Sequence, residues 1–146
     1  MATRKAEAQW KGSFPKGTGT IQLGSGAFEG AYSYASRFEE EKNTNPEELI
    51  GAAEAGCFSM ALGKMLSEDG HPPTSIHTTA NVHLDKVGND FSISSIDLEC
   101  VAEVANIDED YLKETAEKAR KSCIVSRALT GTEISLNAKL LAVATH

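Results

Sequence analysis

The chain has 146 residues, of which 40% are hydrophobic and 24% charged, which is ordinary for one globular domain. Its formal net charge of -7 argues against nucleic acid or an anionic membrane as a partner, because both require concentrated Lys and Arg. The first thirty residues contain no apolar run typical of a signal peptide, and no later segment is long enough to cross a bilayer. Cytoplasm is therefore the expected location.

Alternating polar and apolar residues predict most of the strands. In chain order they fall at 6–10, 18–23 and 28–38, with Arg37 at the end of the third. A hairpin follows, from 75–87 into 91–104, and its change of phase around Ser94-Ser95 predicts a bulge. A last strand is expected at 133–142.

The helices begin and end at clear signals. Asn45 can cap a helix, Pro46 suits its first position, and Glu48 completes a capping box, so a helix should run from Asn45 to about Leu66 and end near Gly70. This helix is apolar almost all round, which is typical of a buried helix. Further helices are expected at 109–121, capped by Asp108, and at 124–129. The order predicts an α+β fold, an antiparallel sheet wrapped on a buried central helix.

Three cysteines remain to be explained, and in a reducing compartment they do not form a structural disulfide framework. Cys57 lies in the apolar helix among small residues that leave room beside the thiol, although a buried cysteine is often only a small hydrophobe. Cys123 lies just ahead of a helix, where it could resolve a sulfenic acid on Cys57. Cys100 is in the apolar phase of a strand and is expected in the core.

A reactive Cys57 needs a cation near its thiolate, and Arg37 is the candidate. Glu47 or Glu48 could orient the guanidinium, although both also suit a helix N-terminus, and Arg37 could instead pair with a neighbouring surface acid. Ten helical residues at ~1.5 Å each separate Glu47 from Cys57 by roughly 15 Å. Either the first turn is irregular, or a partner subunit donates the carboxylate.

Other site types are not indicated. The sequence has neither C-x-x-C nor H-x-x-x-H, so a zinc site is not expected. It also lacks a P-loop, a G-x-G-x-x-G and a serine-hydrolase motif.

One long motif carries a family resemblance. The run T-N-P-E-E-L-I-G-A-A-E-A-G-C-F-S-M-A-L at 44–62 resembles the signature of the OsmC/Ohr family of thiol-dependent peroxidases. Together with R-F-E at 37–39 it is more similar to the osmotically inducible OsmC branch. W-x-G at 10–12, P-T-S-I-x-T-T-A-x-V at 73–82 and C-x-V-S at 123–126 also fit, so the resemblance spans the chain and implies one OsmC-like domain over 1–146.

The resemblance implies an intertwined homodimer with active sites at the subunit interface, and an antioxidant enzyme of the osmotic and oxidative stress response. It would reduce organic hydroperoxides, and hydrogen peroxide more weakly, through a redox-active disulfide. Cys57 would be peroxidatic and Cys123 resolving, Arg37 would stabilise the thiolate, and Glu47 would hold the arginine. Ile124 departs from the family, which commonly has proline after the second cysteine; this affects the loop that holds Cys123.

No flavin, haem or metal is implied; the reductant would be an external dithiol such as protein-bound dihydrolipoamide. Candidates for a hydrophobic substrate pocket are Phe28, Phe38, Phe58 and Met60, for which plain core packing is the alternative. A different class of function also stays open. Oxidation of Cys57 and Cys123 could switch a redox sensor or stress-induced binding protein without turnover.

Overall fold

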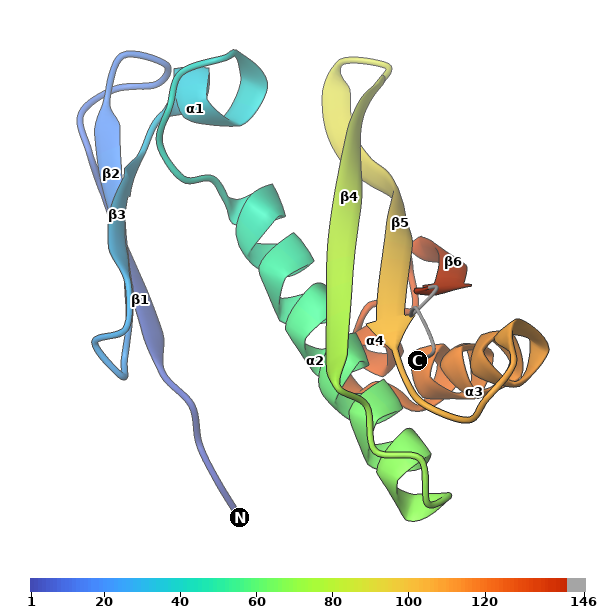
Figure 1. Cartoon of the computed structure of the whole chain (residues 1–146). Helices are drawn as coiled ribbons and strands as arrows, with labels where there is room; N and C mark the ends of the chain where they lie inside the picture. The colour runs from blue at the N-terminus through green and yellow to red at the C-terminus, as the bar shows by residue number, and fades with distance from the viewer. Residues whose placement is uncertain (142–146) are drawn as a thin grey trace. The chain divides into compact units, whose positions relative to one another are not determined.

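The computed structural model describes residues 1–141. It divides into two compact units, Met1–Leu49 and the chain from Ile50 onward. Figure 1 gives the order of the elements along the chain.

The first unit contains a three-stranded antiparallel sheet in the order β1-β2-β3. Its strands are β1 (Ala6–Lys11), β2 (Thr18–Leu23) and β3 (Glu29–Tyr32). The first two strands lie where alternation predicts them. The third prediction was wrong in extent, because the chain leaves β3 after Tyr32 and forms a short helix, α1 (Tyr34–Phe38).

A capping box explains this difference. The Ser36 backbone N–H donates to Ser33 Oγ at 3.1 Å, and the Ser33 backbone N–H donates to Ser36 Oγ at 2.8 Å. These two bonds satisfy donors at the helix start. The capping box favours a helix over 34–38 more strongly than the alternating pattern there favours a strand. Arg37 therefore lies on a helix and not on a strand.

Helix α2 (Pro46–Glu68) is the longest helix in the chain's described part. It begins as predicted, with the Glu48 backbone N–H donating to Asn45 Oδ1 at 2.7 Å, and the chain turns at Gly70 with φ of 85°. With 23 residues, α2 is long and apolar enough to cross a membrane, so the expectation about membrane-length segments was wrong. Helices buried in a protein core pass the same test, and Phe58, Leu62 and Leu66 of α2 are fully buried in the core.

The second unit contains another three-stranded sheet, in the order β4-β5-β6. Its strands are β4 (Ser75–Val87), β5 (Asp90–Glu103) and β6 (Glu133–Leu140). The β4–β5 hairpin is antiparallel, and its register shifts between His83 and Leu84, opposite the expected bulge. The predicted end of the last strand, Ala142, lies outside the described residues.

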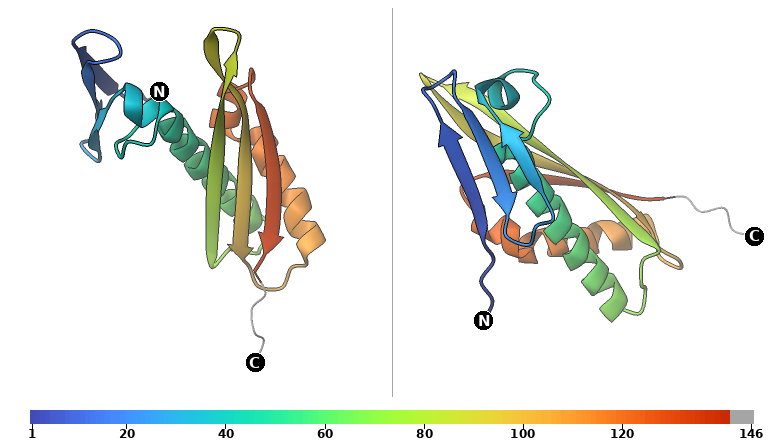
Figure 2. Two further views of the ribbon diagram at one scale, coloured as in Figure 1. Left: turned by 90° about the horizontal axis from the view of Figure 1, so that it is seen from above. Right: turned by 90° about the vertical axis from the view of Figure 1, so that its left-hand side faces the viewer.

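The prediction of purely antiparallel sheets was wrong, because β6 pairs with β5 in parallel. The cause is the connection between them, which contains α3 (Glu109–Ser122) and α4 (Ile124–Ala128). Parallel neighbours require such a long crossover, and two helices provide it. Figure 2 shows the three strands side by side with α3 running along them.

The core of the second unit lies between this sheet and its helices. It is built from α2, β5, α3 and β6, through the buried residues Phe58, Leu62, Leu66, Ile96, Leu98, Cys100, Ala102, Val104, Leu112, Ala116, Ala119, Cys123 and Ala138. Helix α2 approaches β4 closely at Gly51, where an added Cβ would lie 3.1 Å from Val82 Cγ2. Two of the three cysteines are thus core residues by burial, and Cys57 packs against the same cluster.

Candidate active site

Cys57 lies in the middle of α2, half-buried and unpaired by any disulfide. The neighbouring Phe58 points into the core, whereas a Cβ added at Gly56 would meet nothing within 4 Å. The residues described around the thiol therefore leave it partly accessible from one side, as the small residues of this helix predict.

Cys123 lies at the junction of α3 and α4 and belongs to both. Its backbone N–H donates to Ala119 O and ends α3, and its Sγ accepts the Ser126 backbone N–H at 3.5 Å and caps α4. The side chain is buried, and it interacts with that of Cys57. The structure thus brings together two thiols that are 66 positions apart in the sequence.

The environment of Cys123 favours the protonated thiol. Burial raises the pKa of Cys123, and its contact with Cys57 raises it further. Hydrogen bonding with Ser126 opposes this effect, while the charge of Glu54 adds to it. Cys123 therefore needs a proton acceptor before it can attack as a thiolate.

Arg37 and Glu47 form an ion pair within the first unit. Arg37 Nε donates to Glu47 Oε1 at 2.8 Å, and Nη2 lies 2.7 Å from the same oxygen. The Arg37 side chain is 42% exposed, but that of Glu47 only 9%. Arg37 therefore pairs with Glu47 and not with one of the surface acids that follow α1.

Local hydrogen bonds hold the two halves of this pair in place. Ser36 Oγ donates to Thr44 O at 2.9 Å, and Asn45 Nδ2 donates to Ser36 O at 3.1 Å. These bonds tie α1, which carries Arg37, to the residues that begin α2, which carry Glu47. Glu48, the other candidate carboxylate, is exposed.

The four candidate pocket residues lie in different surroundings. Phe58 is fully buried in the core of the second unit, which is the packing alternative, and Met60 on the same helix is 78% exposed. In the first unit, Phe28 is partly exposed, and the Phe38 ring stacks near Tyr34, with centroids 5.0 Å apart. The Arg37 guanidinium carbon lies 5.1 Å from the centroid of the Phe38 ring.

Cys100 is a core residue, as predicted. It is buried in β5, and burial raises the pKa of its thiol, an effect that a hydrogen bond with Thr78 partly opposes. Within residues 1–141, no group of three or more His, Cys, Asp and Glu side chains is placed to hold a metal ion.

Two further residues belong to the cysteine cluster and were not predicted as site residues. Glu54 is fully buried on α2, and the Ser126 hydroxyl donates to its Oε1. A signal for Glu54 exists in the sequence, because it is a charged residue inside an apolar helix, one turn before Cys57. Ser126 has no comparable signal, since only the fold brings α4 against α2.

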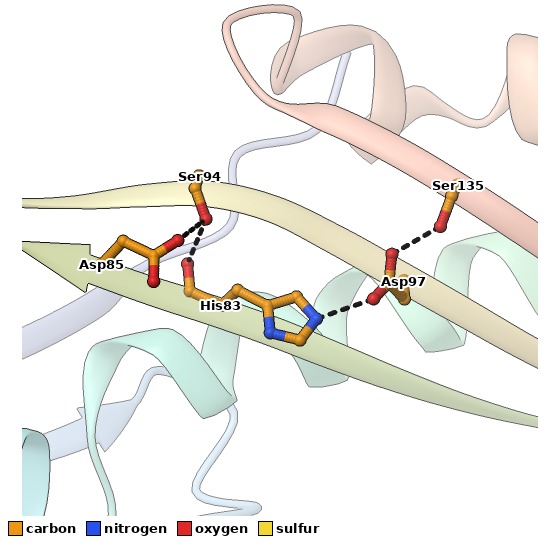
Figure 3. Close-up of polar contacts among 5 residues, drawn as sticks. All are labelled: His83, Asp85, Ser94, Asp97 and Ser135. Atoms are coloured by element: carbon orange, nitrogen blue, oxygen red, sulfur yellow. Dashed lines mark hydrogen bonds and ion pairs between the residues drawn. The ribbon is translucent and has the colours of Figure 1, made fainter.

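A second polar cluster lies on the exposed face of the sheet (Figure 3). His83 Nε2 is 2.7 Å from Asp97 Oδ2, and Ser135 Oγ donates to Asp97 Oδ1 at 2.5 Å. Serine and histidine therefore both contact the aspartate and not each other. This is not the order of a nucleophilic triad, in which histidine stands between the other two.

Comparison with known proteins identifies the family of the chain that carries this cysteine pair. Residues 39–139 match the family model described as OsmC-like protein. The chain belongs to the OsmC-like family. It is 47% identical over 138 residues to "Peroxiredoxin OsmC" of Escherichia coli (strain K12), a match that covers 94% of this chain and 96% of that protein.

Solved structures of OsmC-like proteins share the fold. An OsmC-like protein of unknown function from Vibrio cholerae superposes with a TM-score of 0.77 at 16% identity, covering 95% of this chain and 100% of that one. An organic hydroperoxide resistance protein from Elizabethkingia anophelis gives a TM-score of 0.76 at 22% identity, with 97% and 98% covered. These likenesses confirm an OsmC-like α+β fold.

Proposed function

We propose that this chain reduces organic hydroperoxides, and hydrogen peroxide more weakly, with Cys57 as the peroxidatic and Cys123 as the resolving cysteine. The observation that carries the proposal is the contact between these two thiols in a member of the OsmC-like family. Its E. coli relative is named a peroxiredoxin, and this chain is likewise a cysteine-based peroxidase.

The reaction needs only thiol chemistry. The Cys57 thiolate attacks the distal peroxide oxygen, the O–O bond breaks, and the alkoxide leaves with its electron pair and takes up a proton as the alcohol. Cys57 is oxidised to a sulfenic acid. Cys123 then attacks the Cys57 sulfur, a disulfide forms, and hydroxide leaves as water.

Arg37 would stabilise the Cys57 thiolate and the charge that develops on the peroxide oxygens, and Glu47 would fix the guanidinium. The ion pair between Arg37 and Glu47 supports this role, because it uses Nε and Nη2 and leaves other guanidinium N–H groups to donate elsewhere. No flavin, haem or metal takes part in these steps. An external dithiol, such as dihydrolipoamide on a lipoyl domain, would reduce the disulfide. The protein would work in the cytoplasm, where such a dithiol is available.

The working form would be an intertwined homodimer in which the sheets of both copies enclose the α2 helices. Helix α2 supports this arrangement, since Met60 is highly exposed and only 28% of its most apolar 18-residue window is buried. Helix α2 is also regular from Pro46 onward, which removes the irregular first turn as an explanation for Glu47 acting on Cys57. We therefore place the Arg37–Glu47 pair of one subunit at the Cys57 of the other.

The first test is consumption of cumene hydroperoxide under excess dihydrolipoamide. Wild type should turn over, Cys57→Ser should be inactive, and Cys123→Ser should stop after about one turnover per subunit because its sulfenic acid is not resolved. Cys100→Ala is the matched control and should keep wild-type turnover. A fully active Cys57→Ser, or no consumption by wild type, would refute the proposal and favour a redox sensor or binding protein.

A mixed dimer tests the shared site. Cys57→Ser and Glu47→Gln chains should each be poorly active alone, but mixing them should restore about a quarter of wild-type activity if the carboxylate acts across the interface. Half of randomly mixed dimers are then heterodimers with one complete site. If both groups act within one chain, the mixture recovers nothing.

A further inference from the structure

Glu54 is a buried acid for which the two-cysteine cycle gives no role. The side chain is fully buried within the second unit, and its Oε2 has no hydrogen-bond partner among the described residues. Burying a carboxylate costs several kcal/mol unless it is well paired. A residue kept at this cost beside the cysteines needs an explanation.

Ser126 lies between Glu54 and the resolving thiol and contacts both. The Ser126 hydroxyl donates to Glu54 Oε1, and the backbone N–H of the same residue donates to Cys123 Sγ at 3.5 Å. A hydroxyl has one proton to donate and two lone pairs, so it can donate to Glu54 while accepting the S–H of Cys123. Ser126 thus contacts both Cys123 and Glu54, and its hydroxyl can pass a proton from one to the other.

We propose that Glu54 accepts the proton of Cys123 through the Ser126 hydroxyl when Cys123 attacks the sulfenic acid of Cys57. This inference rests on the proposed two-cysteine cycle. Because Glu54 acts through Ser126 and not by touching the reacting sulfurs, it is a positioning residue for the resolving step.

The step balances as follows. The Cys123 S–H proton moves to Ser126 Oγ while the Ser126 hydroxyl proton moves to Glu54. The Cys123 sulfur then donates its electron pair to the Cys57 sulfur, the S–O bond breaks, and hydroxide leaves with that bond's electrons. Glu54 returns its proton to Ser126 Oγ while the Ser126 hydroxyl proton passes to the hydroxide, and water is released. The Cys123 sulfur is oxidised, the Cys57 sulfur is reduced, and Glu54 ends unchanged.

The charges around this path fit the role. Arg120 on α3 interacts electrostatically with Glu54, and its own guanidinium is held by Glu117, with Nε to Oε1 at 3.0 Å. Before oxidation, the charge of Glu54 helps to keep Cys123 protonated and so spares it from direct attack by peroxide.

Single-turnover kinetics test the proposal. Reduced protein is mixed with one equivalent of cumene hydroperoxide; dimedone trapping follows the sulfenic acid, and free-thiol titration follows the disulfide. Glu54→Gln can still accept the Ser126 hydrogen bond but cannot take the proton. It should form sulfenic acid at the wild-type rate and resolve it about 100-fold more slowly at neutral pH, the loss typical of removing a general base. The defect should shrink at alkaline pH, where solvent deprotonates Cys123.

Two further variants keep the result decisive. Ser126→Ala interrupts the path while leaving Glu54 in place, and it should show the same selective and pH-dependent defect, also if Glu54→Gln folds poorly. Glu114→Gln, which changes an exposed acid on α3 outside the path, should resolve at the wild-type rate. If the first two variants resolve like wild type at every pH, the relay is refuted while the peroxidase cycle stands. If wild type itself forms no disulfide, the cycle fails first.

Discussion

Arg37 contacts a single oxygen of Glu47 with two of its nitrogens, Nε at 2.8 Å and Nη2 at 2.7 Å. The second oxygen, Oε2, is buried and has no hydrogen-bond partner among the described residues. A buried carboxylate oxygen is costly to leave unpaired. A hydrogen-bond donor from substrate or from a second copy of the chain would therefore gain the most binding free energy at Oε2.

Replacing Glu47 by Gln should therefore impair catalysis much more than folding. Glutamine keeps the shape and one acceptor but removes the charge that fixes the guanidinium, so kcat/KM for cumene hydroperoxide should fall about 100-fold. Glu48→Gln is the matched control, since Glu48 is the adjacent exposed acid in the same helical turn, and it should retain wild-type kcat/KM. Equal losses in both variants would assign Glu47 to helix-terminus electrostatics alone.

Much of the fold could be predicted because its signals are local. The start of α2 at Asn45, the strand Ser75–Val87 and the bulge beside Ser94 all depend on neighbours in sequence, and all are confirmed. The parallel pairing of β6 with β5 depends on where α3 and α4 return the chain, and no local pattern reports that.

The site divides in the same way. Arg37 and Glu47 are ten residues apart. The residues alone left Glu47 and Glu48 open as partners of Arg37, and the resemblance named Glu47, which is the partner in the structure, although α1 replaced the expected strand. The contact between Cys57 and Cys123 followed from family resemblance, since sequence separation does not report distance in space. The bond between Glu54 and Ser126 spans 72 positions and could be seen only in the folded chain.

The cluster on the sheet face should make stability depend on acid pH (Figure 3). Hydrogen bonds from Ser135 and then from His83 hold the pKa of Asp97 below its usual range. A carboxyl with a depressed folded-state pKa stabilises the protein above its unfolded pKa of about 3.9, and this contribution is lost as pH falls below that value. Asp97→Asn should thus destabilise the protein at pH 7 and have a smaller effect at pH 3.

Urea unfolding at both pH values measures this effect. Glu99→Gln provides the control, because Glu99 is exposed two residues further along the same strand. The interpretation would be wrong if Asp97→Asn cost as much at pH 3 as at pH 7.

The buried thiols should make stability fall at alkaline pH. Burial raises the pKa of Cys100, so this thiol stays protonated in the folded chain while the unfolded one ionises near pH 8.5. The sign follows directly: its contribution is fully present below pH 8.5 and is lost as pH rises. Between pH 7.5 and 9.5 under reducing conditions, wild type should lose more unfolding free energy than Cys100→Ala. Parallel pH profiles for the two proteins would contradict this.

Truncation of two residues that are two positions apart on α2 should change the free energy of unfolding by very different amounts. Leu62 is fully buried in the core, so Leu62→Ala should lower the unfolding free energy by about 2–5 kcal/mol at a protein concentration where self-association is constant. Met60 is 78% exposed, so Met60→Ala should leave the stability of the isolated chain nearly unchanged. If Met60 packs against a second copy, the same change should weaken self-association, which sedimentation velocity over a dilution series measures. A Met60→Ala chain that self-associates like wild type would remove Met60 from the interface.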